Sequence, residues 1–315
     1  MPFLENVVRG RRVPPSRLQE VAGHYAIFGG VSPITALTQR QADALGARLR
    51  SAPLPLPVFV GMRNWHPFLA DTLSQMSRGG VRNAIGLIAA PHRSYSSCAQ
   101  YRENVRDARA EIRRAGLADV AVTYVEDWHA HPGYVAACAD RALEAIARLP
   151  APLQPAARLV FTAHSIPESQ AARYPYRAQF EETARLVRDA VERSDGVERI
   201  HACVYQSRSG RPEDPWLGPD VSDYLIEARA AGLEAAVLCP IGFICDHIEI
   251  LFDLDVEAAE AGRSVGLPMT RAAAVNDHPR FVDTMADVVQ RTWARYARGV
   301  PLGLQEKERK GDDRF

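Results

Sequence analysis

The sequence predicts an α/β fold built around parallel sheets. Two observations support this prediction: short apolar runs rich in β-branched residues alternate with amphipathic segments, and the runs are apolar almost without interruption. A strand that is buried on both faces has this near-continuous apolar character, which is typical of a parallel sheet covered by helices. Strands that alternate with helices in this way are joined by right-handed crossovers.

The expected elements follow one another along the whole chain. Strands are predicted at 57–62, 84–89, 120–125, 159–163, 200–205 and 235–240. Helices are predicted at 38–50, 67–76, 100–115, 177–193 and 279–296. The clearest helix is 177–193, because Phe180, Ala184, Val187 and Val191 recur at helical spacing and form one apolar face.

A proline-containing segment near the middle of the chain, 151–155, predicts a linker. We therefore expect an N-terminal α/β lobe over 1–150 and a C-terminal α/β lobe over 151–278. The last helix, at about 279–297, is expected to pack back on the first lobe. No glycine-rich dinucleotide fingerprint and no P-loop occur in the sequence, so no nucleotide cofactor is expected.

Composition and charge exclude several classes of protein. The 315 residues are 47% apolar, and 38 basic residues balance 38 acidic ones, so no bulk charge attracts nucleic acid or an anionic membrane. No apolar run is long enough to cross a bilayer, and the first twelve residues do not resemble a secretory signal. The cysteines are odd in number and form no CxxC pair, which argues against a disulfide framework or zinc site and predicts a cytoplasmic protein. They are Cys98, Cys138, Cys203, Cys239 and Cys245.

A histidine stands at the carboxyl end of an expected strand. His164 follows the apolar run 159–163 and precedes Ser165, Ile166 and Pro167. In open α/β sheets, ligands bind outside the carboxyl ends of the strands. From its position alone, His164 fits equally well as a histidine hydrogen-bonded in a turn and as a base or metal ligand.

An acidic stripe is predicted on the segment 246–257. If this segment is a regular helix, Glu249, Asp253 and Glu257 fall within an arc of about 80° that also contains Asp246, while apolar residues cover most of the rest. Stacked carboxylates repel one another unless a cation or protons neutralise them. The alternative is a solvated face with Arg or Lys partners elsewhere, which is weakened because no such residue occurs between 240 and 261. Carboxylates with an imidazole suit a divalent metal such as iron, and His247 could join or support them.

Two further segments carry weaker signals. Polar residues 206–209 follow the expected strand 200–205, and Trp216 and Leu217 then enter a turn; packing explains this pattern as well as ligand binding does. Gly29 and Gly30 permit a tight turn before Ser32, which is suited to cap a helix that begins with Pro33. The same position could instead present Ser32 and backbone amides to an anion.

Taken in order, these segments resemble the ferrochelatase family. The matching motifs are GGVSP at 29–33, RNWHP at 63–67, TAHSIP at 162–167, YQSRSG at 205–210 with WLGP at 216–219, and PIGFICDHIE at 240–249. They cover most of the chain, and the ordered set is far more specific than any one of them. The segment 94–103 resembles the branch of the family that uses coproporphyrin III.

The resemblance implies two flavodoxin- or Rossmann-like lobes with parallel sheets and a porphyrin in the cleft between them. It implies a lyase that inserts Fe²⁺ into a porphyrin in haem biosynthesis, with coproporphyrin III favoured and protoporphyrin IX possible. His164 and Glu249 match the catalytic, metal-binding pair, and Asp253 and Glu257 match an acidic row of metal ligands. The matching porphyrin-binding positions are Ser32, Tyr101, Arg9 near the propionates, Tyr25, and His24, which stands where an arginine is common.

The chain departs from the family in two places. By comparison with the family and the usual spacing of such units, we expect that about 20 residues, one strand and a porphyrin-contacting loop, are absent before Met1, through a misplaced start or a truncation. Some relatives bind a [2Fe–2S] cluster through C-terminal cysteines, but none follows Cys245 here, so no cluster and no cofactor beyond the substrate iron is expected.

Two alternatives stay open on the sequence. One is a chelatase for another metal or tetrapyrrole, although such enzymes often use a pair of histidines. The other is a two-lobed porphyrin- or haem-binding protein without catalysis. The sequence does not fix the oligomeric state, for which a monomer is favoured, and it predicts no nucleic-acid partner and no transmembrane segment.

Overall fold

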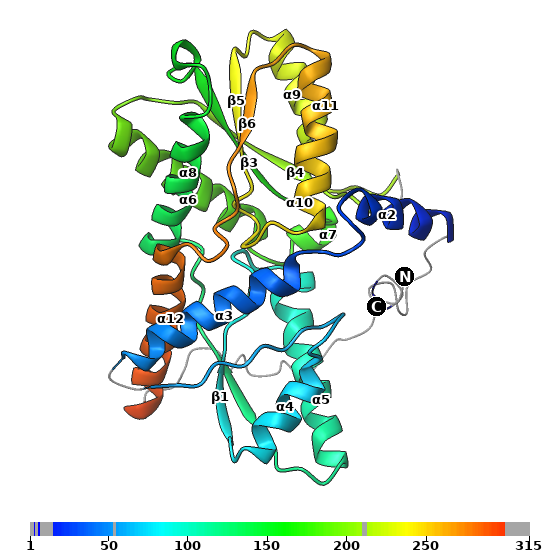
Figure 1. Ribbon diagram of the computed structural model, residues 1–315, viewed down its shortest axis with the longest axis vertical. Helices are drawn as coiled ribbons and strands as arrows, with labels where there is room; N and C mark the ends of the chain where they lie inside the picture. The colour runs from blue at the N-terminus through cyan, green and yellow to red at the C-terminus, as the bar shows by residue number, and fades with distance from the viewer. Residues whose placement is uncertain (1–2, 4–5, 7–14, 53–54, 210–212, 300–315) are drawn as a thin grey trace.

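The computed structural model describes residues 15–52, 55–209 and 213–299, together with Phe3 and Asn6 (Figure 1). This part of the chain forms two separate parallel sheets, one of two strands in the order β1-β2 and one of four in the order β4-β3-β5-β6. Helices surround both sheets, so the predicted α/β class with parallel strands is confirmed. None of the described helices is both long and apolar enough to span a membrane.

The smaller sheet pairs β1 (Asn83–Gly86) with β2 (Ala121–Tyr124) in parallel register from Asn83↔Ala121 to Gly86↔Tyr124. Helices α4 (Leu69–Arg78) and α5 (Gln100–Arg114) pack on each other beside it. Their apolar faces share one core with the residue that precedes β2. This core contains Leu73, Met76, Ala108, Ile112 and Val120. The predicted strands at 84–89 and 120–125 are thus present in shorter form.

The strand predicted at 57–62 is wrong. The segment is extended, but its only bridge joins Met62 to Phe68, a few residues further along. Met62 donates its N–H to the Pro67 carbonyl at 2.8 Å and accepts from Leu69 N–H at 3.2 Å, so its backbone groups are used in a local loop. Pro57 has no N–H to offer a ladder. The apolar signal reflected burial, because Val58 and Phe59 pack against core clusters without joining a sheet.

The larger sheet contains β3 (Ala157–His164), β4 (His201–Gln206), β5 (Ala235–Cys239) and β6 (Met269–Arg271), all parallel. One face of β3, with Leu159 and Phe161, packs on helices α6 (Pro132–Ile146) and α8 (Tyr176–Asp195). The other face, with Val160, meets α9 (Val221–Ala230) and the helices that follow β5. Burial on both faces explains the continuous apolar runs. The short β6 was not predicted, because three half-buried residues carry no periodic signal.

The predicted helices are confirmed with boundaries that differ by a few residues. The segments 38–50 and 279–296 lie in α3 (Ile34–Arg50) and α12 (Pro279–Ala297), and 67–76, 100–115 and 177–193 correspond to α4, α5 and α8. The remaining helical elements are α2 (Pro15–Ile27), the π-helix η1 (Tyr95–Ala99), the 3₁₀ turn η2 (Ala151–Leu153), α7 (Glu168–Ala171), α10 (Ile248–Phe252), the π-helix η3 (Asp253–Glu257) and α11 (Ala258–Ser264).

Two helices cross between the sheets. Helix α6 precedes the segment 151–155 in sequence, yet it packs on β5, β6 and α8 of the larger sheet. Helix α12 follows the larger sheet and packs on α3 and β1 as well as on α6 (Figure 1). Buried aromatic rings fill the place where they meet: Tyr134 lies edge-on to Trp128 at 5.1 Å and Phe281 lies 5.7 Å from Trp128. The two sheets are therefore joined through packed helices as well as through the linker.

Candidate active site

His164 ends β3 with its ring held in one orientation. Its Nδ1 lies 2.5 Å from the Ser165 carbonyl oxygen, and because a carbonyl only accepts, Nδ1 carries a proton and the neutral form of the ring has its lone pair on Nε2. The Tyr176 hydroxyl donates to the His164 carbonyl at 2.8 Å and fixes the backbone of the strand end. The side chain remains 32% exposed, so Nε2 is available as a base or a metal ligand.

Glu249 faces this histidine from the first turn of α10. Its Oε2 lies 4.0 Å from His164 Nε2 and 4.0 Å from His247 Nδ1. These separations exceed a hydrogen bond, so His164 Nε2 and Glu249 Oε2 both keep their acceptor capacity. His247 caps α10 by accepting from Glu249 N–H at 3.3 Å through Nδ1, and burial lowers the pKa of its imidazole. His247 therefore positions the backbone of Glu249.

Asp253 lies one turn after Glu249, at the start of η3. Its Oδ2 accepts hydrogen bonds from the Ser207 hydroxyl and from Gln206 Nε2, the latter at 3.3 Å. Burial raises the pKa of the Asp253 carboxyl to about 7, and the nearby carboxylates of Glu249 and Glu257 add to the rise against the opposing effect of Ser207. Asp253 can therefore take up and release a proton near neutral pH.

The regular helix predicted over 246–257 is wrong in part. The helix begins at Ile248, and Asp253–Glu257 form a π-helix between α10 and α11. Asp246 precedes the helix and is not in the acidic stripe: its Oδ1 pairs with Arg271 at 2.7 Å and its Oδ2 accepts from Asn276 at 2.8 Å. Arg271 also pairs with Asp255, at 2.6 Å. Arg271 of β6 is thus the basic partner of both Asp246 and Asp255. This agrees with the alternative interpretation, in which acidic residues of this segment pair with basic residues elsewhere in the chain.

Helix α2 brings two of the predicted porphyrin-binding residues close to Glu249. The His24 ring stacks on Phe252 of α10, with centroids 3.5 Å apart and planes at 10°. Burial, followed by the Glu249 carboxylate, raises the pKa of the Tyr25 hydroxyl to about 12. Helix α2 thus packs on α10, with His24 against Phe252 and Tyr25 near enough to Glu249 to be affected by its charge.

The other predicted porphyrin-binding residues come from the first half of the chain. Ser32 is half-buried, and its hydroxyl accepts from Ile34 N–H at 3.3 Å; α3 begins at Ile34, one residue later than expected, so Pro33 is its N-cap. Tyr101 lies in the first turn of α5 under the guanidinium of Arg63, 4.9 Å from the ring centre. Burial raises the pKa of Tyr101 against the opposing effect of Arg63, and the Cys245 thiol, in the loop before α10, adds a smaller rise. Arg9 lies outside the described residues.

The comparison with known proteins decides which family this arrangement belongs to. A sequence model of the ferrochelatase family matches residues 1–293. The chain belongs to the ferrochelatase family. It is 43% identical over 299 residues to the coproporphyrin III ferrochelatase of Streptomyces coelicolor, a match that covers 92% of this chain and 80% of the relative. It is 44% identical over 292 residues to the ferrochelatase of Rhodopirellula baltica, with the same coverage.

The structural comparison agrees at the level of the fold. SirB from Bacillus subtilis with Fe³⁺ has a TM-score of 0.58 over 84% of this chain and 92% of SirB, at 11% sequence identity. At this identity the likeness concerns the two-lobed α/β architecture. The predicted fold and the predicted resemblance to ferrochelatases are thus confirmed.

For a ferrochelatase, the predicted metal ligands are arranged as a row. His164 and Glu249 face each other, Asp253 follows on the next turn, and Glu257 is near enough to raise the pKa of Asp253. Over the described residues, no three or more His, Cys, Asp or Glu side chains are grouped tightly enough to hold a metal ion together. The metal-binding roles of these four residues stay predictions.

Three supporting residues of the site were given no role from the sequence: Gln206 and Ser207 were named only within the weak polar segment 206–209, and Tyr176 was not named. Gln206 and Ser207 contact Asp253, and Tyr176 fixes the end of β3. The signal for the first two was present, because polar residues follow the expected strand 200–205 and carboxyl ends of neighbouring parallel strands meet at one edge. No such signal marks Tyr176, which reaches the site from α8.

We expect Asp253→Asn to stabilise the protein in alkaline but not in acidic solution. The folded-state pKa of about 7 lies above the usual value near 3.8, so the folded state holds the proton more tightly and stability falls as pH rises between these values. The asparagine has no such pH dependence. Urea unfolding at pH 8 should show a gain of up to about 4 kcal/mol over the wild type. The exposed control Asp107→Asn should show none, and an equal gain for Asp253→Asn at pH 4 would contradict the raised pKa.

Gly242 lies against the strand that carries His164. Its N–H donates to the Thr162 carbonyl at 3.0 Å, and a Cβ at this position would lie 2.5 Å from both Cα and Cβ of Ala163. We expect Gly242→Ala to lower the free energy of unfolding by about 1–3 kcal/mol, because the added methyl must push β3 or the loop aside. Urea denaturation measures this, with Gly23→Ala as control, since nothing lies within 4 Å of a Cβ there. Equal stability of the two variants would contradict this prediction and show that the loop after β5 moves aside without a cost in free energy.

Proposed function

We propose that this chain inserts Fe²⁺ into a porphyrin, with coproporphyrin III as the favoured substrate and protoporphyrin IX as the second. The observation that carries the proposal is the pair formed by His164 and Glu249, whose acceptor atoms face each other 4.0 Å apart without a hydrogen bond between them. The relatives named coproporphyrin III ferrochelatases, at about 43% identity, support the preferred porphyrin.

The chemistry of insertion requires that two pyrrole protons leave while the metal enters. His164 carries a lone pair on Nε2 and accepts the first proton from the ring. Glu249 then accepts a proton or binds the arriving iron, and Asp253, with a pKa of about 7, passes protons on to solvent. Fe²⁺ is a substrate that moves along the row formed by Glu257, Asp253, Glu249 and His164, so these residues need not bind it all at once.

The porphyrin would lie between the lobe that contains the smaller sheet and the lobe that contains the larger sheet. Ser32, Tyr101, Tyr25 and His24 would contact the macrocycle or its edge, and Arg9 would bind a propionate, since carboxylates favour guanidinium and hydroxyl partners. Tyr25 and His24 lie beside α10, and this contact supports their place near the reacting centre. Binding energy from the rim of the ring would help to distort it for metal entry.

We further propose that the enzyme holds no [2Fe–2S] cluster and works as a monomer in the cytoplasm. The five thiols are free, and Cys138, Cys239 and Cys245 are buried among apolar side chains, where burial raises the pKa of each thiol. Free thiols are typical of a reducing compartment. Iron analysis of the purified protein tests the cluster, and sedimentation tests the oligomeric state.

Parallel assays under anaerobic conditions test the function and the preferred porphyrin. The purified chain is given Fe²⁺ with either coproporphyrin III or protoporphyrin IX, and the porphyrin absorption bands are followed. We expect turnover with both porphyrins and a higher kcat/KM for coproporphyrin III. A preference for protoporphyrin IX would contradict the branch, and activity only with another metal or tetrapyrrole would contradict the proposed substrates.

A further inference from the structure

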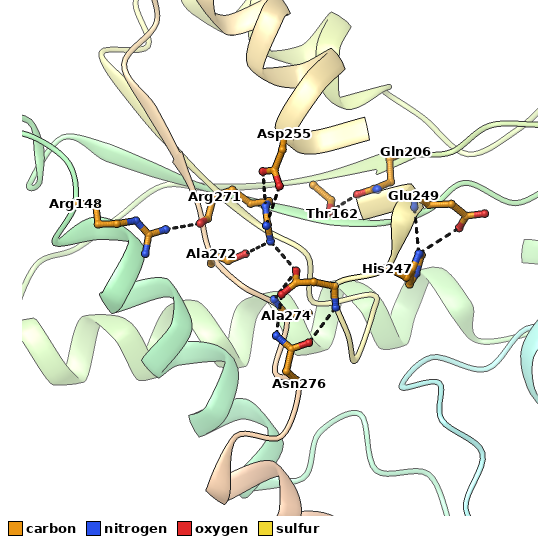
Figure 2. A network of polar contacts seen from close by, with 11 residues as sticks. Arg148, Thr162, Gln206, His247, Glu249, Asp255, Arg271, Ala272, Ala274 and Asn276 are labelled. Carbon is orange, nitrogen blue, oxygen red and sulfur yellow. Dashed lines mark hydrogen bonds and ion pairs between the residues drawn. The ribbon is translucent and has the colours of Figure 1, made fainter. Parts of the chain in front are cut away.

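A buried chain of hydrogen bonds runs from the inside of the larger sheet to the acidic row. Thr162 on β3 is fully buried and Gln206 at the end of β4 is 1% exposed. The Thr162 hydroxyl donates to Gln206 Oε1 at 2.7 Å, and Gln206 Nε2 donates to Asp253 Oδ2 at 3.3 Å (Figure 2 shows the first of these contacts). Two residues that cannot reach the substrate are thus linked to one that is proposed to bind iron.

The hydrogen-bonding capacity of each group fixes the direction of this chain. Ser207 and Gln206 both approach the same oxygen of Asp253, so that oxygen is an acceptor and the amide must turn its NH₂ group towards it. The amide oxygen of Gln206 then faces the buried interior, where it needs a donor. The Thr162 hydroxyl is the side chain that supplies this donor.

Gln206 also ties the acidic row to the proposed base. It is the register partner of His164 across β3 and β4, and its carbonyl accepts from Ser165 N–H at 2.7 Å. The chain turns sharply after it, because Ser207 adopts a positive φ of 62°, a conformation that residues other than glycine rarely take. Both the backbone and the side chain of Gln206 therefore set the distance between His164 and Asp253.

We propose that Thr162 and Gln206 are positioning residues for iron delivery: Thr162 fixes the orientation of the Gln206 amide, and the amide holds the Asp253 carboxylate in the acidic row. This role rests on the proposed iron insertion. Without the Thr162 hydroxyl, the Gln206 amide has two orientations, and both are unfavourable. If its NH₂ group still faces Asp253, its buried oxygen has no donor; if the amide is reversed, its oxygen faces the Asp253 carboxylate. Either arrangement displaces Asp253 from the position that it has here.

The test is Thr162→Val, which keeps the shape of the side chain and removes the donor. In anaerobic insertion assays we expect kcat/KM for Fe²⁺ to fall about five- to tenfold, the value of one buried hydrogen bond. The KM for the porphyrin should stay within about twofold of the wild type, because Thr162 does not contact that substrate. Thr162→Ser restores the hydroxyl and should restore kcat/KM for iron.

The matched control is Thr292→Val. Thr292 is also buried, and its hydroxyl donates to the Val288 carbonyl at 2.7 Å within α12, away from the acidic row. This variant should leave both kinetic constants unchanged. If Thr162→Val changes kcat/KM for Fe²⁺ and KM for the porphyrin by the same factor, Thr162 has only a structural role and the inference is overturned. The same holds if Thr162→Ser does not restore kcat/KM for Fe²⁺.

A second variant covers the case in which Thr162→Val does not fold. Gln206→Met removes the amide with little change in length and should lower kcat/KM for iron in the same way; an unchanged value overturns the inference. The wild type separates this result from the parent proposal. A wild type that inserts no iron counts against the proposed function, whereas an active wild type with an equally active Thr162→Val counts against the positioning role alone.

Discussion

His164→Ala is expected to lower the rate of iron insertion by about 10²–10⁴-fold, the range for loss of a positioned general base. The lone pair on Nε2 is lost, and nothing else at the end of β3 replaces it as a proton acceptor. The affinity for porphyrin should largely survive, because most of the proposed contacts with the ring come from Ser32, Tyr101 and α2. Stopped insertion with retained binding would separate the proton-accepting role from a binding role.

The measurements are kcat in an anaerobic insertion assay and porphyrin affinity from fluorescence quenching. His201→Ala is a matched control, since His201 starts β4 at the opposite end of the same sheet and pairs in register with Leu159. This variant should keep both properties. If His164→Ala loses insertion and porphyrin affinity to the same extent, His164 is not the base.

Glu249→Gln should reduce kcat/KM for iron by about 10²-fold or more, since the amide keeps the shape but neither accepts a proton nor binds a cation as a carboxylate does. The same variant can also be tested without substrates, through the pKa of Tyr25. The Glu249 carboxylate contributes to the raised pKa of Tyr25, so its removal should lower that pKa from about 12. Ultraviolet titration of the tyrosines in the absence of substrates detects the change.

The matched control for this variant is Glu260→Gln. Glu260 is an exposed carboxylate that pairs with Arg263 within α11, which follows α10 and η3 along the chain. Its replacement should leave both insertion and the Tyr25 titration unchanged. A normal kcat/KM for iron in Glu249→Gln would remove Glu249 from the proposed mechanism, whatever the titration shows.

Much of the fold could be predicted because parallel strands that are buried on both faces appear in the sequence as continuous apolar runs. The runs 159–163 and 235–240 were located to within two residues at their starts, since α6 and α8 on one side and α9 on the other demand apolar side chains throughout. The segment 57–62 has the same composition for a different reason, namely packing of Val58 and Phe59 outside a sheet. Composition records burial, and it does not record which backbone groups are paired.

The site could be predicted only where one residue type at one position carries the chemistry. His164 and Glu249 were named from their motifs, and the structure brings them together. The contacts of Asp246 could not be predicted, because its partner Arg271 is 25 residues away on a strand too short to recognise. The π-helix at Asp253–Glu257 was missed because side-chain periodicity was read with α-helical geometry. The support that Gln206 and Thr162 give to Asp253 depends on strand register, which a single sequence leaves open.

The most direct measurement is the number of porphyrin molecules metallated by each molecule of the purified 315-residue chain, with Fe²⁺ and coproporphyrin III supplied anaerobically in large excess. A ferrochelatase releases its product and begins again, so the metallated porphyrin should exceed the protein many times over, and His164→Ala should stop the accumulation. Porphyrin that binds in a fixed ratio to the protein and never gains iron would contradict catalysis and identify a porphyrin carrier.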